Sequence, residues 1–155
     1  MVERASGSAL DALKARMESS SWNGARLSAG EPRAQIDVRA RGNGAHRAAA
    51  ILGVASLPVP NRVIATRNGE CYWLGPTEWL WVGPPGERRF TLRALEKAIV
   101  DDDGAVVDVS SSRVILDLVG PSAREVLASC CALDLHPRVF GPGQCAQTLV
   151  GKAPV

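Results

Sequence analysis

The sequence predicts an α+β fold in which a strand–helix–strand–strand module is used twice. Strands and amphipathic helices alternate along the chain, two segments repeat at an offset of 78 residues, and each copy is too short to close a core alone. The 155 residues, 46% hydrophobic and 22% charged, suit one globular domain rather than a disordered chain. We expect an N-terminal extension over 1–31, partly flexible, and a single domain over 32–155, with repeats at about 34–100 and 105–155.

The first thirty residues show little sustained periodicity. Leu10, Leu13 and Met17 have the spacing of one short amphipathic helix. Residues 19–32 are typical of a linker that ends at Pro32. Charged residues interrupt the apolar ones, and no stretch approaches the ~18–20 apolar residues of a membrane span. A cytoplasmic location is therefore expected.

The first repeat begins with a strand and a helix. Apolar and polar residues alternate over 34–41, which predicts a half-buried strand. Residues 42–44 contain two glycines and predict a turn, and 45–52 are rich in helix formers. The face of this helix that we expect to be buried is formed by Ala48, Ile51 and Leu52.

The middle of the chain predicts three further strands and a second helix. Residues 62–66, 71–74 and 78–82 have strand character, with a hairpin turn at 68–69. Residues 91–100 predict an amphipathic helix, because their leucine, isoleucine and alanine residues recur on one side.

The second repeat follows the same order. Residues 105–109 and 114–119 predict strands, and 123–132 predict a helix that begins beside a proline. The offset places Gly42 on Gly120, at the start of the helix in each copy. The first copy continues through another strand and helix that the second lacks. Roughly 25–45 residues are missing if the copies are alike, so we expect the second copy to be C-terminally truncated.

Charge and cysteine content exclude two classes of site. Lys and Arg total 18 against 16 for Asp and Glu, and no basic run occurs, which argues against nucleic-acid binding through bulk charge. Cys71, Cys130, Cys131 and Cys145 lack the spacing of zinc ligands. We expect them to be buried, reduced and structural, and we expect no metal site.

The sequence offers little catalytic chemistry. His136 and Asp134 lie two residues apart and could form a base and its orienting carboxylate, but loop histidines are more often structural. The second histidine, His46, is near the start of a surface helix. The glycines at 42 and 44 resemble the start of a dinucleotide fingerprint, yet Arg47 occupies the third glycine position. We therefore expect neither catalytic nor cofactor-binding residues in this chain.

Aromatic residues are the candidates for a binding surface. Trp73, Trp79 and Trp81 lie within nine residues, and the last two share one face of a strand. They either fill the core or form an aromatic hot spot for a partner protein, because tryptophan and arginine dominate interface energetics. Tyr72 and Arg138 are further interface candidates.

Five segments carry a resemblance to a known family. They are LGPTEWLWV at 74–82, DVSS at 108–111, GPSAREVL at 120–127, CALDLHPRVF at 131–140 and GQCAQTL at 143–149. With these segments the chain, from about residue 30 to 155, resembles the gamma subunit of heterotetrameric sarcosine oxidase. The strand–GPxA–helix segment alone is shared with the wider folate-binding aminomethyltransferase (T-protein) superfamily.

The resemblance implies a fold related to half of the T-protein and a structural place in a complex with alpha, beta and delta subunits. That complex oxidatively demethylates sarcosine to glycine, forms hydrogen peroxide and passes the one-carbon unit to tetrahydrofolate. The resemblance also implies that the alpha subunit carries NAD and folate, the beta subunit FAD and covalent FMN, and the delta subunit zinc. The family often reads D-x-S-H where this chain has Ser111, so any role of that histidine is absent here.

An alternative hypothesis is a free-standing, folate-binding aminomethyltransferase-like protein. It requires a central pocket with a carboxylate for the pterin. The candidates that the sequence places on strands are Asp37, Glu78, Asp108 and Asp117.

Overall fold

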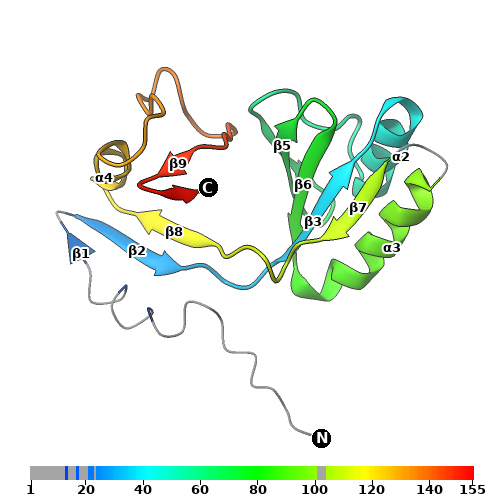
Figure 1. Cartoon of the computed structure of the whole chain (residues 1–155), viewed down its shortest axis with the longest axis horizontal. Helices are drawn as coiled ribbons and strands as arrows, with labels where there is room; N and C mark the ends of the chain where they lie inside the picture. Colours follow the sequence, from blue (N-terminus) through cyan, green and yellow to red (C-terminus); the bar gives the residue numbers. More distant parts are fainter. Residues whose placement is uncertain (1–12, 14–16, 18–20, 23, 101–103) are drawn as a thin grey trace, which may run out of the picture.

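The computed structural model describes residues 13, 17, 21–22, 24–100 and 104–155 and has two lobes (Figure 1). Element labels follow that figure. The first lobe contains β3 (Ala34–Arg39), α2 (Gly42–Leu52), β4 (Val63–Thr66), β5 (Gly69–Gly75), β6 (Glu78–Gly83), the 3-10 turn η1 (Pro85–Glu87), α3 (Arg88–Ile99) and β7 (Ala105–Asp108). The second contains β1 (Ser21–Trp22), β2 (Ala25–Ala29), β8 (Leu116–Val119), α4 (Ala123–Ala128), β9 (Leu149–Val150) and β10 (Ala153–Pro154).

The strands form three sheets, and all their strand pairs are antiparallel. The first lobe has a five-stranded sheet in the order β4-β5-β6-β3-β7, with α2 and α3 on one face. The second lobe has a three-stranded sheet, β1-β2-β8, and the two-stranded sheet β10-β9. The α+β class predicted from the sequence is thereby confirmed.

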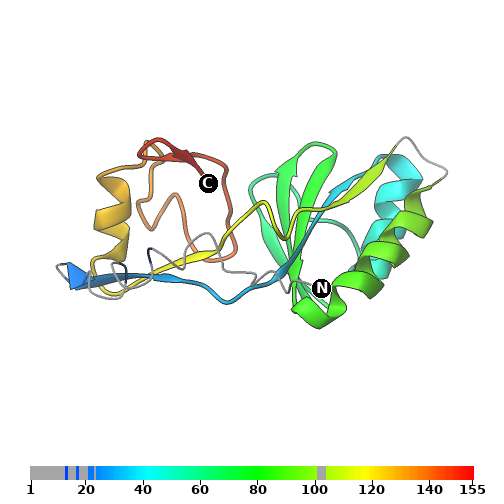
Figure 2. The ribbon, with the colours of Figure 1, turned by 60° about the horizontal axis from the view of Figure 1, so that its bottom comes forward.

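Two long antiparallel segments run through both lobes (Figure 2). The chain passes from β2 into β3 and from β7 into β8, and β2 pairs with β8 while β3 pairs with β7. Ala29 lies opposite Leu116 and Ile36 lies opposite Asp108, so the register changes by one residue between the lobes. We call these two segments, residues 25–39 and 105–119, the inter-lobe ribbon.

Hydrogen bonds join the two segments of the ribbon where it crosses between the lobes. The Gly30 N–H donates to the Ile115 carbonyl at 2.8 Å, and the Val109 N–H donates to the Gln35 carbonyl at 2.9 Å. The Gln35 N–H donates to Ser110 Oγ at 2.9 Å. Gln35 is 5% exposed, and these bonds satisfy its buried polar groups.

The core of the first lobe lies between the sheet and the two helices. Its members are apolar side chains from one face of β3, β5 and β6 and from the facing sides of α2 and α3. Burial of each large side chain in such a core stabilises the fold by roughly 1.5–3 kcal/mol. The largest side chains that are fully buried are those of Ile36, Val38, Cys71, Trp81 and Leu95.

The second lobe contains few buried apolar residues, and one of them is Ala25 on β2, at 6% exposure. Within 104–155, Leu135 is the sole residue classed as buried, at 6% exposure. Hydrogen bonds hold the lobe together instead. The Arg124 guanidinium on α4 donates to the carbonyls of Leu135 and Phe140, and the Gly151 N–H donates to the Cys130 carbonyl at 2.7 Å.

Several boundaries differ from the sequence predictions. The linker expected over 19–32 is wrong, because β2 forms a full ladder with β8. The turn expected at 42–44 is the first turn of α2, and Ile51 on that helix is 37% exposed rather than buried. The helix expected over residues 10–17 lies largely outside the described residues.

Two other predictions need smaller corrections. Thr66 pairs with Gly69, so the hairpin loop is formed by Arg67 and Asn68 rather than by residues 68–69. The helix expected to reach residue 132 ends at Ala128. No helix in the described part of the chain has the length and apolar character to cross a bilayer.

The ribbon crossing predicts a strong effect of Gly30→Ala. A Cβ at position 30 would lie 2.5 Å from Ile115 Cγ2, so the Ile115 side chain or the ribbon backbone must shift to admit it. We expect a loss of about 1–3 kcal/mol in unfolding free energy, measured by urea denaturation of the full chain. Gly86→Ala is the matched control, since no atom lies within 4 Å of its Cβ. Equal stability of the two variants would contradict this packing.

Candidate functional site

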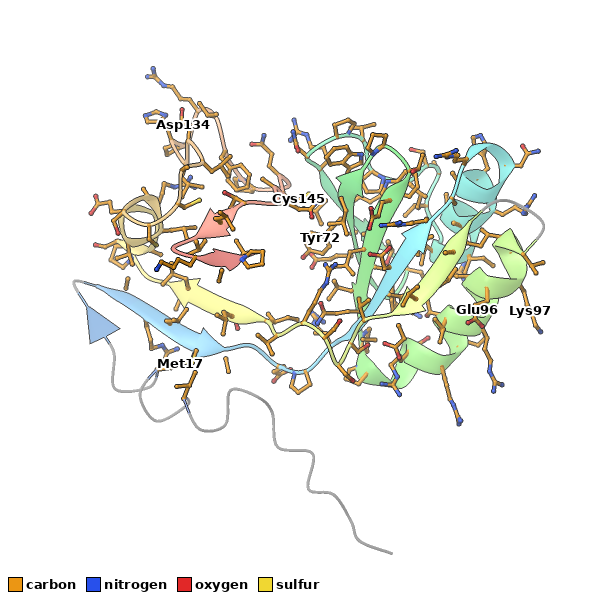
Figure 3. All side chains as sticks on the ribbon, in the orientation of Figure 1. Met17, Tyr72, Glu96, Lys97, Asp134 and Cys145 are labelled. Carbon is orange, nitrogen blue, oxygen red and sulfur yellow. The ribbon has the colours of Figure 1, made fainter. Side chains whose placement is uncertain are left out.

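The two lobes face each other across a cavity on the helix-free face of the five-stranded sheet. Its volume is about 350 Å³, and Glu31 and Asp117 from the second-lobe side meet Glu70 and Tyr72 from β5. Figure 3 shows Tyr72 and Cys145 where the lobes meet. The Tyr72 hydroxyl donates to Glu70 Oε2 at 2.9 Å. Burial, followed by the Glu70 carboxylate, raises the pKa of Tyr72 to about 12, so the phenol stays protonated.

The four strand carboxylates do not converge on this cavity. Asp117 lines it, whereas Asp37 lies beside Glu78 on the sheet. Glu78 Oε1 is 3.1 Å from Arg39 Nη2, and Asp37 Oδ2 is 3.9 Å from Arg113 Nη2. Burial and the neighbouring Glu78 carboxylate raise the pKa of Asp37 above its ordinary value, and the two arginines oppose that shift.

Asp108 lies in an environment that lowers its pKa, whereas the environment of Asp37 raises the pKa. Its Oδ1 accepts hydrogen bonds from the Ser110 hydroxyl at 2.6 Å and the Ser110 N–H at 3.0 Å, and its Oδ2 lies 3.5 Å from Arg88 Nε. These hydrogen bonds favour the ionised form and lower the pKa of Asp108. Its role is therefore to brace the ribbon and the start of α3.

Two of the three candidate tryptophans belong to the core. Trp79 is 7% and Trp81 is 1% exposed, and their indole N–H groups donate to the Pro58 carbonyl and to Thr66 Oγ1. Of the two alternatives, the structure favours core filling for this pair and corrects their assignment to a partner surface, because a partner could reach almost none of either side chain. Trp73, paired with Trp79 across the sheet, is half-buried.

The remaining interface candidates and the histidines lie elsewhere. Arg138 is exposed in the loop after Leu135, and its N–H donates to His136 Nδ1 at 3.2 Å. The His136 N–H donates to Asp134 Oδ1 at 2.9 Å, so this carboxylate holds the loop backbone rather than orienting the imidazole. His46 is exposed on α2. These contacts support structural roles for the histidine loop.

The cysteines have different environments. Cys71 is fully buried, and desolvation raises its thiol pKa to about 12. Cys130 is exposed, and Cys131 and Cys145 are partly exposed, so the expectation that all four are buried is wrong. The described residues contain no group of three or more His, Cys, Asp or Glu side chains placed to hold a metal ion.

The GQCAQTL segment forms a second connection between the lobes. The Cys145 N–H donates to the Asn61 carbonyl at 3.0 Å, and the Val63 N–H donates to the Gly143 carbonyl at 3.1 Å. Gln147 Nε2 also donates to the Leu74 carbonyl at 2.6 Å. The segment thus attaches the second lobe to the edge of the first, a contact that its sequence alone does not show.

A second cavity, which we call the basic cavity, lies beside the ribbon crossing, and Arg33 lines both it and the inter-lobe cavity. Its volume is about 510 Å³, and its polar lining is Arg33, Arg88, Arg89, Ser110 and Ser111. The sequence did not reveal this cavity, because Arg33 is more than fifty residues away from the adjacent Arg88 and Arg89.

Aliphatic side chains are exposed on more than one face of the second lobe, since Leu116 and Val119 point to opposite sides of β8. Four such side chains, which together we call the second-lobe surface, are those of Leu116, Val119, Val139 and Leu149, each between 46% and 56% exposed. The sequence offered an aromatic partner surface as one of two alternatives for the tryptophans and did not predict the exposed aliphatic residues of the second lobe.

The contrasting carboxylates predict opposite effects of two matched substitutions. Asp37→Asn should raise the urea midpoint at pH 7, because the folded state disfavours the charge that the variant removes. Since the folded pKa is raised, this gain should shrink as the pH falls through the raised value toward the ordinary 3.8, because the folded carboxyl protonates first. Asp108→Asn should lower the midpoint at pH 7, and this loss should also fade below 3.8, since its folded pKa is lowered. Shifts of the same sign at pH 7 would contradict this assignment.

Comparisons with known proteins match most of the chain. The sarcosine oxidase, gamma subunit family matches residues 39–155. Sarcosine oxidase subunit gamma from Corynebacterium sp. (strain P-1) and that from Arthrobacter sp. are each 37% identical over 124 residues. Each alignment covers 78% of this chain and 60% of the relative, so the chain matches under two thirds of the length of these relatives.

Two solved structures share its fold. A chain of heterotetrameric sarcosine oxidase from Corynebacterium sp. U-96, in complex with pyrrole 2-carboxylate, has a TM-score of 0.83 and 31% identity, covering 96% of this chain and 78% of that one. Glycine cleavage system aminomethyltransferase T from Bartonella henselae has a TM-score of 0.52 and 22% identity, and the alignment covers 69% of this chain and 32% of that one. At this identity the similarity shows a shared fold and no shared function. The expected resemblance is confirmed, and the chain belongs to the sarcosine oxidase gamma subunit family.

Proposed function

We propose that this chain is the gamma subunit of a heterotetrameric sarcosine oxidase and that its role is structural. The complex would oxidatively demethylate sarcosine to glycine, form hydrogen peroxide and transfer the one-carbon unit to tetrahydrofolate. The family match over residues 39–155 and the similarity to a chain of a solved heterotetramer support this proposal.

The observation that carries the structural role is the exposure of the second lobe. Its only residue classed as buried in 104–155 is Leu135, while the second-lobe surface leaves four aliphatic side chains about half exposed. Removing apolar surface from water is worth about 25 cal/mol per Å². A partner that covers this surface would therefore stabilise both the second lobe and the assembly.

We propose the partners and cofactors that the resemblance implies. Alpha, beta and delta subunits would surround this chain, with NAD and tetrahydrofolate in alpha, FAD and FMN in beta, and zinc in delta. Tyr72, Trp73 and Arg138 are proposed as contacts to them. Arg138 is exposed and Tyr72 and Trp73 are half-buried, so each leaves surface for a partner.

We also propose that the two lobes descend from one duplicated module. In both, a ribbon strand is followed by a glycine with positive φ and a helix, with φ of 48° at Gly42 and 120° at Gly120. β2 pairs with β8 as β7 pairs with β3. Within residues 104–155 the second copy shows no counterpart of β6 and α3.

Co-expression with alpha, beta and delta subunits tests the proposed function. We expect this chain to co-purify with them and the complex to show sarcosine-dependent oxygen uptake. The full chain purified alone should show neither flavin absorbance nor uptake. An active, yellow preparation of the single chain would contradict the structural role, and saturable tetrahydrofolate binding to it would favour the aminomethyltransferase-like alternative.

A variant of the second-lobe surface tests, in the same co-expression experiment, whether this surface contacts a partner subunit. Leu116→Ser with Leu149→Ser should lower the yield of complex while leaving the unfolding free energy of the full chain within about 0.5 kcal/mol for each exposed site. Val100→Ser is the control, because Val100 is 74% exposed on the first lobe. Equal yields of complex from the variant and the control would refute a partner contact at the second-lobe surface.

A further inference from the structure

We propose that the basic cavity binds an acidic segment of a partner subunit. This inference rests on the proposed function and deepens it, because it assigns one contact of the assembly to a defined group of side chains. The cavity of about 510 Å³ is lined on its polar side by three arginines and two serines.

The fold brings these side chains together from three separate segments. Arg33 lies between β2 and β3, Arg88 and Arg89 lie in the first turn of α3, and Ser110 and Ser111 lie between β7 and β8. They meet because both segments of the inter-lobe ribbon pass this point. The hydrogen bonds of Gln35 to Ser110 and Val109 fix the spacing of the ribbon here.

Two of the three guanidiniums lack a carboxylate partner. Arg88 lies 3.5 Å from Asp108, a carboxylate that is shared with Ser110. Arg33 and Arg89 are exposed, and neither forms an ion pair with any residue that the structure describes. A planar guanidinium binds a carboxylate through two parallel hydrogen bonds. The cavity therefore fits aspartate or glutamate side chains from outside the chain.

The shape of the cavity favours a protein segment over a small molecule. Pockets for small ligands are predominantly apolar and enclose most of the ligand surface. This cavity is open and is bounded by exposed arginines, Pro32 and the Pro85–Gly86 turn. A partner segment could place carboxylates between Arg33 and Arg89 while its backbone stays outside. The start of α3 adds a positive helix end to the same site.

Charge reversal in the assembled protein tests this contact. We expect Arg33→Glu with Arg89→Glu to weaken association with the co-expressed partner subunits by about tenfold or more, as close interfacial charge pairs do. Arg88 is kept, so its pair with Asp108 is preserved. Arg33→Lys with Arg89→Lys, which keeps the charges, should retain most of the association. Raising the salt concentration should weaken the wild-type complex more than the reversed variant.

Arg93→Glu with Lys97→Glu is the matched control. Both residues are exposed on α3 outside the cavity, and Lys97 lies on the outer side of that helix (Figure 3). This variant changes the net charge by the same amount and should associate within about twofold of wild type. Should the reversed variant fail to give a native circular-dichroism spectrum, Arg33→Gln with Arg89→Gln replaces it, with the same direction of effect expected.

The outcomes separate this inference from the proposed function. If the wild-type chain does not associate with the partners, the proposed function fails. If the wild type associates and the cavity variant matches the control, only the acidic-segment contact is overturned. Stabilisation of the wild type but not of the cavity variant by inorganic phosphate, with unchanged association, would also overturn it by assigning the cavity to a small anion.

Discussion

The antiparallel inter-lobe ribbon determines how the two lobes are joined. Because β2 continues into β3 and β7 into β8, one pair of segments supplies the adjacent strands β3 and β7 at one side of the first sheet and two strands of the second. The buried Gln35, with its bonds to Val109, Ser110 and Arg113, fixes where the lobes cross. The inter-lobe cavity and the basic cavity both lie at this crossing.

The two lobes differ in how they are stabilised. In the first, Trp81, Ile36 and Leu95 pack between sheet and helices and leave almost no surface exposed. In the second, Arg124 and backbone hydrogen bonds hold short elements around Leu135. Each hydrogen bond makes a net contribution of only about 0.5–1.5 kcal/mol to the stability of the folded state. A lobe without a large buried core gains more stability from a partner that covers its apolar side chains. This property fits a subunit whose proposed role is in assembly.

The sequence predicted elements whose pattern is local. Alternation over 34–41 predicted β3 (Ala34–Arg39), and the apolar periodicity of 91–100 predicted most of α3 (Arg88–Ile99). The sequence did not predict β2, because its partner strand β8 lies about ninety residues later and no local pattern indicates that pairing. For the same reason, the approach of Arg33 to Arg89 was not visible. The tryptophans could be assigned only as core or surface, since β6 is buried on both faces.

We infer that partner subunits complete the second lobe. Amide hydrogen exchange of residues 116–150, compared between the full chain alone and the chain in its complex, is the decisive measurement. We expect weak protection of these amides in the isolated chain and strong protection in the complex, while β3 and β6 are protected in both. Strong protection of 116–150 in the isolated chain, with no change upon assembly, would contradict it.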